Sequence, residues 1–244
     1  MENIKALFID CDGVLYNDAE NADDNIVNIS LGKTLAPYGI SMDEFNQTRA
    51  SLKEEGIRGL FNSALDLCHR YRIEFSDFAV NMVNNTDYSE IPSDPEMLEL
   101  LKKVGTCIPV YIVTNNTAPH LIKIFDQLRG KVSSQNPQEE LGIHLISIEN
   151  TLAFDRECQR TIFHPKQMKD QFKKLCAQLD LLPGQVALID DTERIRKKAE
   201  KQGMHTISTN GPEDIKEILR RVIHEKSKPE RIVSVRKTRG GLGD

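Results

Sequence analysis

The sequence predicts an α/β protein: a doubly wound parallel β-sheet with helices on both faces and a helical cap inserted after the first strand. Short, continuously apolar runs recur along the chain, which is typical of parallel strands because helices cover both of their faces. Helical patterns lie between the later runs, so strands and helices alternate. Residues 18–90, between the first run and the second, have helical patterns only, and this interval predicts the cap.

Five runs are interpreted as the strands of the sheet, the last of them weaker than the others: residues 4–9, 109–113, 143–148, 186–189 and 204–208. Four segments beside them have helical periodicity: residues 95–104, 120–128, 168–179 and 194–202. Gly203 follows the last of these helices, and glycine is a common left-handed residue at the end of a helix.

Four further helices are expected in the interval after the first strand: residues 25–38, 41–54, 59–72 and 76–84. Ser41 is followed three residues later by Glu44, which is the pattern of a capping box. We therefore assign the cap domain to residues 18–90. The α/β core domain takes residues 1–17 and 91–222, and the basic, glycine-ended residues 223–244 are expected to form a flexible tail.

Composition and charge exclude several classes of function. The 244 residues are 39% hydrophobic and 28% charged, as in an ordinary globular protein, and the net charge of −5 gives no field that would attract nucleic acid or a membrane. The five cysteines include no Cys-x-x-Cys pair, which argues against a disulfide framework or a zinc site. No signal peptide and no apolar run of about 20 residues is evident, so we expect a cytoplasmic protein.

Two carboxylates separated by one residue, Asp10 and Asp12, end the first apolar run and precede Gly13. The carboxyl ends of strands at a switch point are where open α/β sheets bind ligands. Because the chain turns here, the two acids can take separate roles, one as a nucleophile toward phosphorus and the other as an acid and base. The structural alternative, in which both acids cap a turn, fits a position directly after a buried strand less well.

The segment from Asp10 to Tyr16 has the pattern Asp-x-Asp-Gly-Val-Leu-Tyr. It resembles the first motif of phosphatases of the haloacid dehalogenase (HAD) superfamily. The resemblance implies a Rossmann-like HAD core and a nucleophilic Asp10 that also binds Mg²⁺. It implies that Asp12 serves as acid and base and that its backbone carbonyl binds the metal, and such an acid argues against the dehalogenase branch.

Two later motifs are similar to those of the same superfamily. Thr114 ends the second strand and, with Asn115, resembles the motif whose hydroxyl binds phosphoryl oxygens. Lys166 resembles the lysine that neutralises the phosphoryl group, because the aromatic residue Phe172 follows it at the usual spacing of six. The proline that normally follows this lysine precedes it here, so Lys169 is an alternative.

The fourth motif is an acidic pair, Asp190 and Asp191, at the end of another apolar run. Burying two adjacent acids is costly without a cation, and Mg²⁺ prefers oxygen ligands. By resemblance, Asp191 binds the metal directly and Asp190 binds it through water. Related nucleotidases often have asparagine four residues after the second acid, where this chain has Ile195. This departure bears on metal affinity and rate rather than on the class of reaction.

The four motifs together imply a Mg²⁺-dependent phosphomonoester hydrolase that forms an aspartyl-phosphate. Three segments, residues 56–60, 87–88 and 92–98, resemble the pyrimidine 5′-nucleotidase-like subgroup, which implies a nucleotide or another small phosphometabolite as substrate. Three residues are candidates for contacts with the substrate beyond its phosphate: Arg58, Tyr88 and His120.

Three alternatives remain open. The first is a phosphoprotein phosphatase acting on phosphotyrosine or phosphoserine, in which basic tail residues would dock on an anionic protein or membrane surface. These tail residues are Lys226, Lys228, Arg231, Arg236, Lys237 and Arg239. The second is a phosphomutase, which shares the core motifs. The third is a non-catalytic binding protein on the same fold, although the intact pair of Asp10 and Asp12 argues against it.

Overall fold

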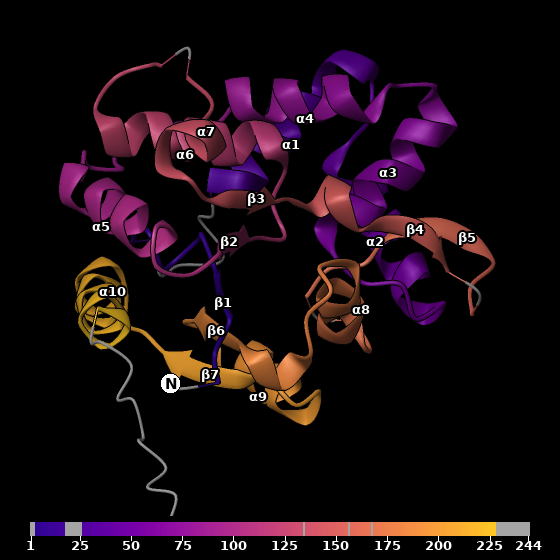
Figure 1. The fold of residues 1–244 in the computed structure, drawn as a ribbon. Coiled ribbons are helices and arrows are strands. Elements are labelled where there is room, and N and C mark those ends of the chain that lie inside the picture. The colour runs from indigo at the N-terminus through magenta and orange to yellow at the C-terminus, as the bar shows by residue number, and fades with distance from the viewer. Residues whose placement is uncertain (1–2, 18–25, 134, 156, 167, 228–244) are drawn as a thin grey trace, which may run out of the picture.

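The computed structural model describes residues 3–17, 26–133, 135–155, 157–166 and 168–227. Its centre is a five-stranded parallel sheet with the order β3-β2-β1-β6-β7 (Figure 1). The strands are β1 (Ala6–Ile9), β2 (Val110–Val113), β3 (His144–Ile146), β6 (Val186–Asp190) and β7 (His205–Ser208). Four of them lie within the runs expected from the sequence and β6 extends one residue further, to Asp190, so the predicted α/β fold is confirmed.

The central strand β1 explains why the apolar runs are continuous. Its side chains point alternately to the two faces of the sheet, and both faces are buried. Leu7 and Ile9 belong to one core cluster, whereas Ala6 and Phe8 belong to the other. The chain order of the strands reverses on the two sides of β1, so its carboxyl end lies at the switch point of the sheet.

Helices cover both faces of the sheet, as expected (Figure 1). The cluster on one face includes residues of α5 (Pro95–Gly105), α6 (Ala118–Arg129) and α10 (Pro212–Lys226). The cluster on the other face includes residues of α8 (Gln171–Gln178) and α9 (Glu193–Lys201). Helix α8 begins at Gln171 rather than at 168, and Gly203 has the expected positive φ of 93° after α9.

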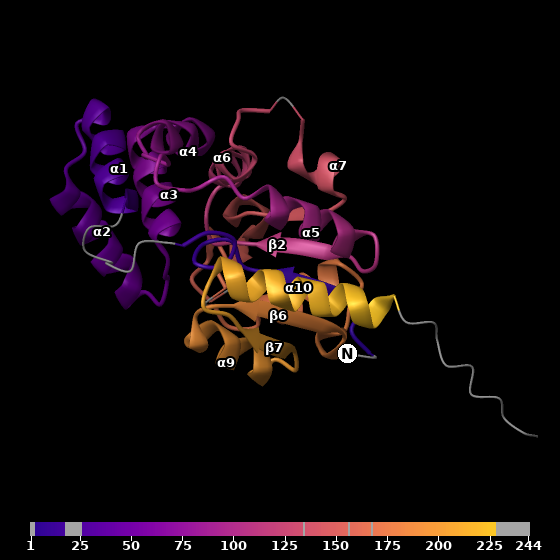
Figure 2. The ribbon, with the colours of Figure 1, turned by 90° about the vertical axis from the view of Figure 1, so that its left-hand side faces the viewer.

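Four helices form the cap, beside the sheet in Figure 2: α1 (Ile26–Leu35), α2 (Met42–Glu54), α3 (Leu60–Tyr71) and α4 (Phe75–Asn84). They enclose a core of their own, which includes Phe45, Leu67 and Phe78. The side chain of Ser41 accepts a hydrogen bond of 3.1 Å from the backbone N–H of Glu44, so this half of the expected capping box is present. Residues 18–25, where the cap was expected to begin, lie outside the described residues.

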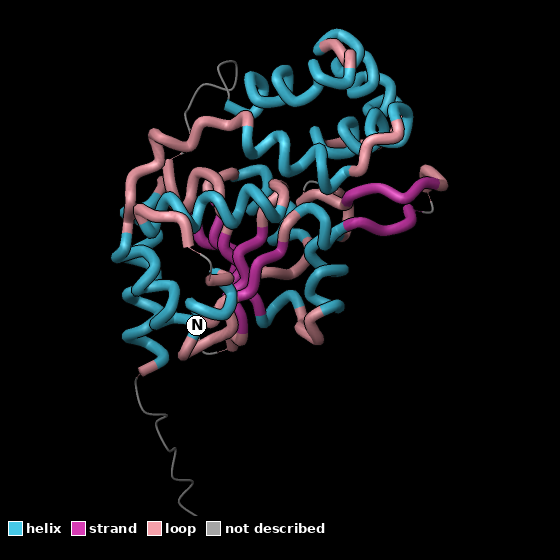
Figure 3. Tube along the Cα trace, turned by 90° about the horizontal axis from the view of Figure 1, so that it is seen from above, coloured by secondary structure: helices cyan, strands magenta, loops and turns pink. Residues whose placement is uncertain are grey.

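An antiparallel hairpin, β4 (Leu152–Asp155) and β5 (Arg160–Phe163), was not predicted (Figure 3). It follows η2 (Ile148–Thr151) and joins the core to the cap, since Phe163 lies in the apolar cluster of the cap. The side chain of Asn62 in α3 donates to the Phe163 carbonyl at 2.9 Å and accepts from its N–H at 2.8 Å. Asn62 and Phe163 lie far apart in the sequence, so no local pattern around the hairpin predicts it.

Three short or terminal elements also differ from the prediction: α7 (Pro137–Leu141), η1 (Ala36–Tyr38) and η3 (Pro183–Gln185) were not expected as separate helices. The expected tail from residue 223 is wrong at its start, because α10 continues through Lys226 and Ile223 packs against the core. The later tail, residues 228–244, lies outside the described part of the chain. None of the helices in that described part is long and apolar enough to span a bilayer.

Candidate active site

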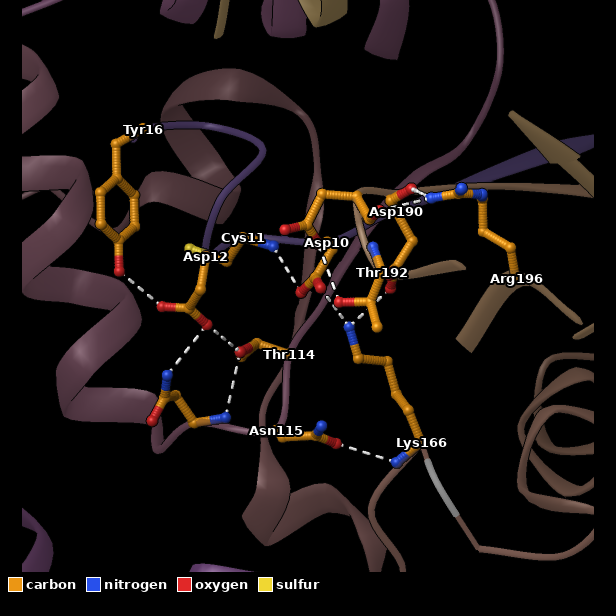
Figure 4. A network of polar contacts seen from close by, with 12 residues as sticks. Asp10, Cys11, Asp12, Tyr16, Thr114, Asn115, Lys166, Asp190, Thr192 and Arg196 are labelled. Carbon is orange, nitrogen blue, oxygen red and sulfur yellow. Dashed lines mark hydrogen bonds and ion pairs between the residues drawn. The ribbon is translucent and has the colours of Figure 1, made fainter. Parts of the chain in front are cut away.

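The residues of the four motifs meet at the carboxyl ends of three adjacent strands (Figure 4). Asp10 directly follows β1, Thr114 directly follows β2, and Asp190 is the last residue of β6. Parallel strands bring these ends to one edge of the sheet, so residues more than a hundred positions apart become neighbours. The structure therefore brings Asp10, Thr114 and Asp190 together, as expected from the sequence, and their roles remain a proposal.

Asp10 and Lys166 form the centre of the site. The Nζ of Lys166 lies 2.5 Å from Oδ2 of Asp10 and 2.9 Å from Oδ2 of Asp190, and all three residues are buried. Burial raises the pKa of the Asp10 carboxyl, and the neighbouring carboxylates add to this while Lys166 opposes it. Burial would lower the pKa of Lys166, but Asp10 and Asp190 together raise it above its ordinary value, so the lysine stays charged.

Lys166 rather than Lys169 is the lysine of this cluster. Lys169 is exposed, and no ion pair is found for it among the described residues. The backbone N–H of Lys166 donates to Oδ1 of Asn115 at 2.8 Å, which ties the lysine to the loop after β2 (Figure 4). Asn115 thus positions the lysine in this structure.

Three carboxylates can meet at one cation. Oxygen atoms of Asp10, Asp190 and Asp191 all lie within 4.8 Å of one another, and Asp191 is exposed to solvent. A single lysine offsets only one of these charges, and a cluster of oxygen ligands is what Mg²⁺ prefers. The donor set therefore fits a magnesium ion.

The loops around this cluster are held by close backbone contacts. Gly13 has a φ of +73°, and a Cβ at this position would lie 2.5 Å from Oδ2 of Asp191, so only glycine fits. Arg196 in α9 donates to the backbone carbonyls of Asp190 and Asp191 at 2.7 and 2.6 Å. Thr192 donates its N–H to Oδ1 of Asp190 at 2.9 Å. Sequence reasoning did not identify Gly13, Thr192 or Arg196 as parts of the site.

Asp12 is held by four donors. Tyr16 and His120 lie 2.6 and 2.9 Å from its Oδ1. Thr114 and Asn116 each donate to its Oδ2 at 2.9 Å. Burial would raise the pKa of Asp12, but His120 and the hydrogen bonds from His120, Tyr16 and Asn116 together hold it far below its usual range. Asp12 is therefore ionised and fixed in one orientation.

The network continues from His120 to Tyr88, whose hydroxyl lies 2.9 Å from Nδ1 of the imidazole. Burial raises the pKa of Tyr88, so the hydroxyl stays protonated and can donate a hydrogen bond to Nδ1 of His120. A neutral imidazole that accepts at Nδ1 donates from Nε2, which is the nitrogen facing Asp12. Tyr88 and His120, considered above as substrate contacts, are thus joined to Asp12 by hydrogen bonds in this structure.

Two other positions discussed from the sequence, the candidate contact Arg58 and the departure at Ile195, lie outside the carboxylate cluster. Arg58 is exposed in the loop before α3, and the structure shows no bond from it to the carboxylate cluster. Ile195 is buried against the sheet with Phe8 and Phe172, so this position is part of the core. A cleft of 220 Å³ separates the cap from the core beside Asn115, and Gly59 and Phe163 are among its lining residues.

A parallel sheet with an inserted helical cap and an acidic cluster at its switch point defines a class of capped α/β hydrolases. A protein-family model of haloacid dehalogenase-like hydrolases matches residues 4–195. The chain belongs to this family and is a hydrolase of the HAD type.

No curated protein matches the chain. Among solved structures it is similar to CbbY from Rhodobacter sphaeroides in complex with phosphate, with 14% identity, a TM-score of 0.50, and coverage of 84% of this chain and 86% of that one. It is also similar to a predicted HAD-like family hydrolase from Porphyromonas gingivalis, with 17% identity, a TM-score of 0.51, and coverage of 90% and 98%. At these identities the likeness shows the fold.

Proposed function

We propose that the protein is a Mg²⁺-dependent phosphomonoester hydrolase that uses Asp10 as its nucleophile. The observation that carries this proposal is the position of Asp10, buried between a charged lysine and two further carboxylates at the switch point of the sheet. A carboxylate in that place can attack a phosphate that enters from the cap side. Asp10 and Asp191 would hold Mg²⁺ there, with Asp190 close by. The metal would offset the negative charge of the phosphoryl group. The carbonyl of Asp12 is proposed as a further ligand.

The proposed reaction has two steps. In the first, an oxygen of Asp10 forms a bond to phosphorus while the ester oxygen leaves with its electron pair and takes a proton from Asp12. In the second, Asp12 takes a proton from water, the water oxygen bonds to phosphorus, and the bond to Asp10 breaks. The pKa of Asp12 is low without substrate, so Asp12 must gain a proton as the phosphate binds. The negative charge of the bound phosphate favours this, because it raises the pKa of the Asp12 carboxyl.

The other polar groups would act on the phosphoryl oxygens. Lys166 keeps its charge and would offset the negative charge of the phosphate while Asp10 attacks. The Thr114 hydroxyl and the Asn115 amide lie at the adjoining strand end and would position the oxygens. The Thr114 hydroxyl would turn from Asp12 toward the phosphate for this purpose.

For the substrate we propose a nucleotide or another small phosphometabolite, as in the pyrimidine 5′-nucleotidase-like subgroup. The narrow cleft between cap and core beside Asn115 supports a small molecule. Arg58 lies on the cap side of this region and remains a proposed contact. No contact among the described residues favours a phosphoprotein or a purely binding role, and a panel of nucleotides, sugar phosphates and phosphopeptides would separate these alternatives.

Hydrolysis of p-nitrophenyl phosphate tests the metal and the reaction together. We expect turnover with Mg²⁺ and its loss after chelation, with recovery when Mg²⁺ is restored. Replacing Asp191 by asparagine should lower kcat/KM by more than about 10²-fold at a fixed low Mg²⁺ concentration, since a metal contributes several kcal/mol to the transition state. Full activity of the wild type in excess chelator would contradict the metal assignment, and a folded protein inactive on the ester and on the panel would contradict the function.

His120 is expected to act as a positioning residue for Asp12. The change His120→Leu removes the donor to Oδ1 of Asp12, and kcat should fall about 10- to 100-fold with little change in KM. The loss should be larger for an alkyl phosphate than for p-nitrophenyl phosphate, whose leaving group needs no proton. His120→Gln, which keeps a donor, should recover part of the rate, and His69→Leu on the exposed surface of α3 is the control. An equal loss on both substrates would indicate a structural role only.

A further inference from the structure

A second cleft, of 530 Å³, lies between the cap and the core on the side of α2 and α9. Its lining includes four cationic side chains from both domains. Arg49 and Lys53 come from α2, Arg58 from the loop before α3, and Arg194 from the first turn of α9 in the core. Among the residues that the structure describes, no acidic side chain lines the cleft.

These four cations are unpaired within the described residues. None of Arg49, Lys53, Arg58 and Arg194 makes an ion pair or a side-chain hydrogen bond to another residue of the described chain. Some exposed basic residues elsewhere in the described chain do pair, as Arg70 does with Glu44 and Asp66, and others, such as Lys169, stand singly; the cleft differs in gathering four of them. All four side chains are exposed, so water solvates them, but like charges gathered in one cleft repel one another and an anion bound between them would remove that repulsion.

The cations face one another across the junction of the two domains. Lys198, one turn further along α9, has its pKa lowered by burial and by the like charges of Arg194 and Arg58. Arg58 of the cap and Arg194 of the core are therefore near the same point. An anion between them would be held from both sides.

This cleft adjoins the smaller cleft beside Asn115 and Pro165. It shares Gly59 and Leu60 with the smaller cleft that Asn115 lines. A Cβ on Gly59 would lie 3.3 Å from the ring of Pro165, the residue before Lys166. A single small molecule can thus place one group at the reacting centre and another among the four cations.

We propose that the substrate carries a second phosphate group, which binds in this cleft between Arg49, Lys53 and Arg58 of the cap and Arg194 of the core. The inference rests on the proposed function, because the first phosphate must be the one at Asp10. Guanidinium groups bind phosphate through paired, charge-assisted hydrogen bonds, and a cleft of this volume suits a small bisphosphorylated molecule. Bound in this way, the second phosphate would hold the cap against the core while the first reacts.

The test compares bisphosphates with their monophosphates. Glucose 1,6-bisphosphate is paired with glucose 6-phosphate, and adenosine 3′,5′-bisphosphate with adenosine 5′-phosphate. We expect kcat/KM to be at least about tenfold higher for one bisphosphate than for its partner, given the strength of charge-assisted hydrogen bonds. Arg194→Gln and Lys53→Gln should each reduce this ratio several-fold. Arg221→Gln, which removes an exposed arginine of α10, should leave it unchanged.

A ratio near one for both pairs in the wild type would overturn the inference, and so would a ratio that Arg194→Gln and Lys53→Gln do not change. Circular dichroism of each variant shows whether it is folded. Calorimetric binding to Asp10→Asn in the presence of Mg²⁺ gives a result without turnover: the preferred bisphosphate should bind more tightly than its monophosphate, and equal affinities would count against the second site. Failure of the wild type to hydrolyse p-nitrophenyl phosphate would instead count against the proposed function.

Discussion

Replacing Asp10 by asparagine should reduce kcat on p-nitrophenyl phosphate by a factor on the order of 10⁴ to 10⁶, the range seen when a covalent nucleophile is removed. The amide has nearly the shape of the carboxylate but is a poor nucleophile. Because burial and the neighbouring carboxylates disfavour the charged form of Asp10, the change should not lower the midpoint of thermal unfolding. The measurement is steady-state turnover with saturating Mg²⁺, beside a thermal melt of the same preparation.

A matched control is Asp77→Asn, which makes the same change at an exposed position in the first turn of α4. It should retain full turnover. If Asp10→Asn kept more than a tenth of the wild-type rate in a preparation free of other phosphatases, Asp10 could not be the nucleophile. A lost rate together with a strongly lowered melting temperature would show that the variant fails by unfolding, and Asp10→Glu would then replace it in the assay.

Replacing Lys166 by methionine should have the largest effect on stability. The side chain offsets two carboxylates, Asp10 and Asp190, and without it both remain buried beside each other. Removing one partner of a buried ion pair typically costs about 3–5 kcal/mol of the free energy of unfolding. We expect a loss of this size in urea denaturation without Mg²⁺, and a smaller loss with Mg²⁺, since a ligand that binds the folded state stabilises it. Turnover should also fall sharply, because the phosphate loses a positive charge at the reacting centre.

The pH dependence of the Lys166→Met variant gives a second check. A buried carboxylate without its lysine has a pKa raised above that of the unfolded chain, so the folded state binds more protons than the unfolded state. Its stability therefore falls as the pH rises, and the deficit relative to wild type should shrink as the pH is lowered. Lys169→Met, three residues away and exposed, should be neutral in both measurements. Equal effects of the two substitutions would contradict the assigned contacts.

The fold could be predicted from the sequence because its main signals are local. Each buried strand is a continuous apolar run, and Asp10, Thr114 and Asp190 stand at or just after the ends of three such runs. Parallel strands bring their carboxyl ends together regardless of the distance along the chain, so the central cluster follows from the topology. The hairpin β4–β5 has no such local signal, because Asn62 and the cap fix it from outside.

The surroundings of Asp12 could be predicted only in part. Thr114 and Asn116 come from the same loop, so the motif brings both near Asp12. The roles of His120 and Tyr88 depend on how α6 and the segment after α4 pack behind the first loop, and this follows from side-chain packing rather than from spacing. Gly13 could have been identified from the sequence, since a glycine that follows the Asp-x-Asp pair indicates a left-handed residue or a close approach of the backbone to another group. The structure shows a positive φ and a close approach to Asp191.

Trapping the covalent intermediate tests whether Asp10 is the nucleophile. In Asp12→Asn, the first step with p-nitrophenyl phosphate needs no acid, but the second step lacks its base, so the phosphorylated enzyme should accumulate. After an acid quench, borohydride reduces an aspartyl-phosphate to homoserine, which peptide mass spectrometry locates in the sequence. We expect homoserine at position 10 and about one equivalent of p-nitrophenolate per enzyme. Release of that equivalent with Asp10 unmodified, or with the phosphate on another residue, would contradict this assignment.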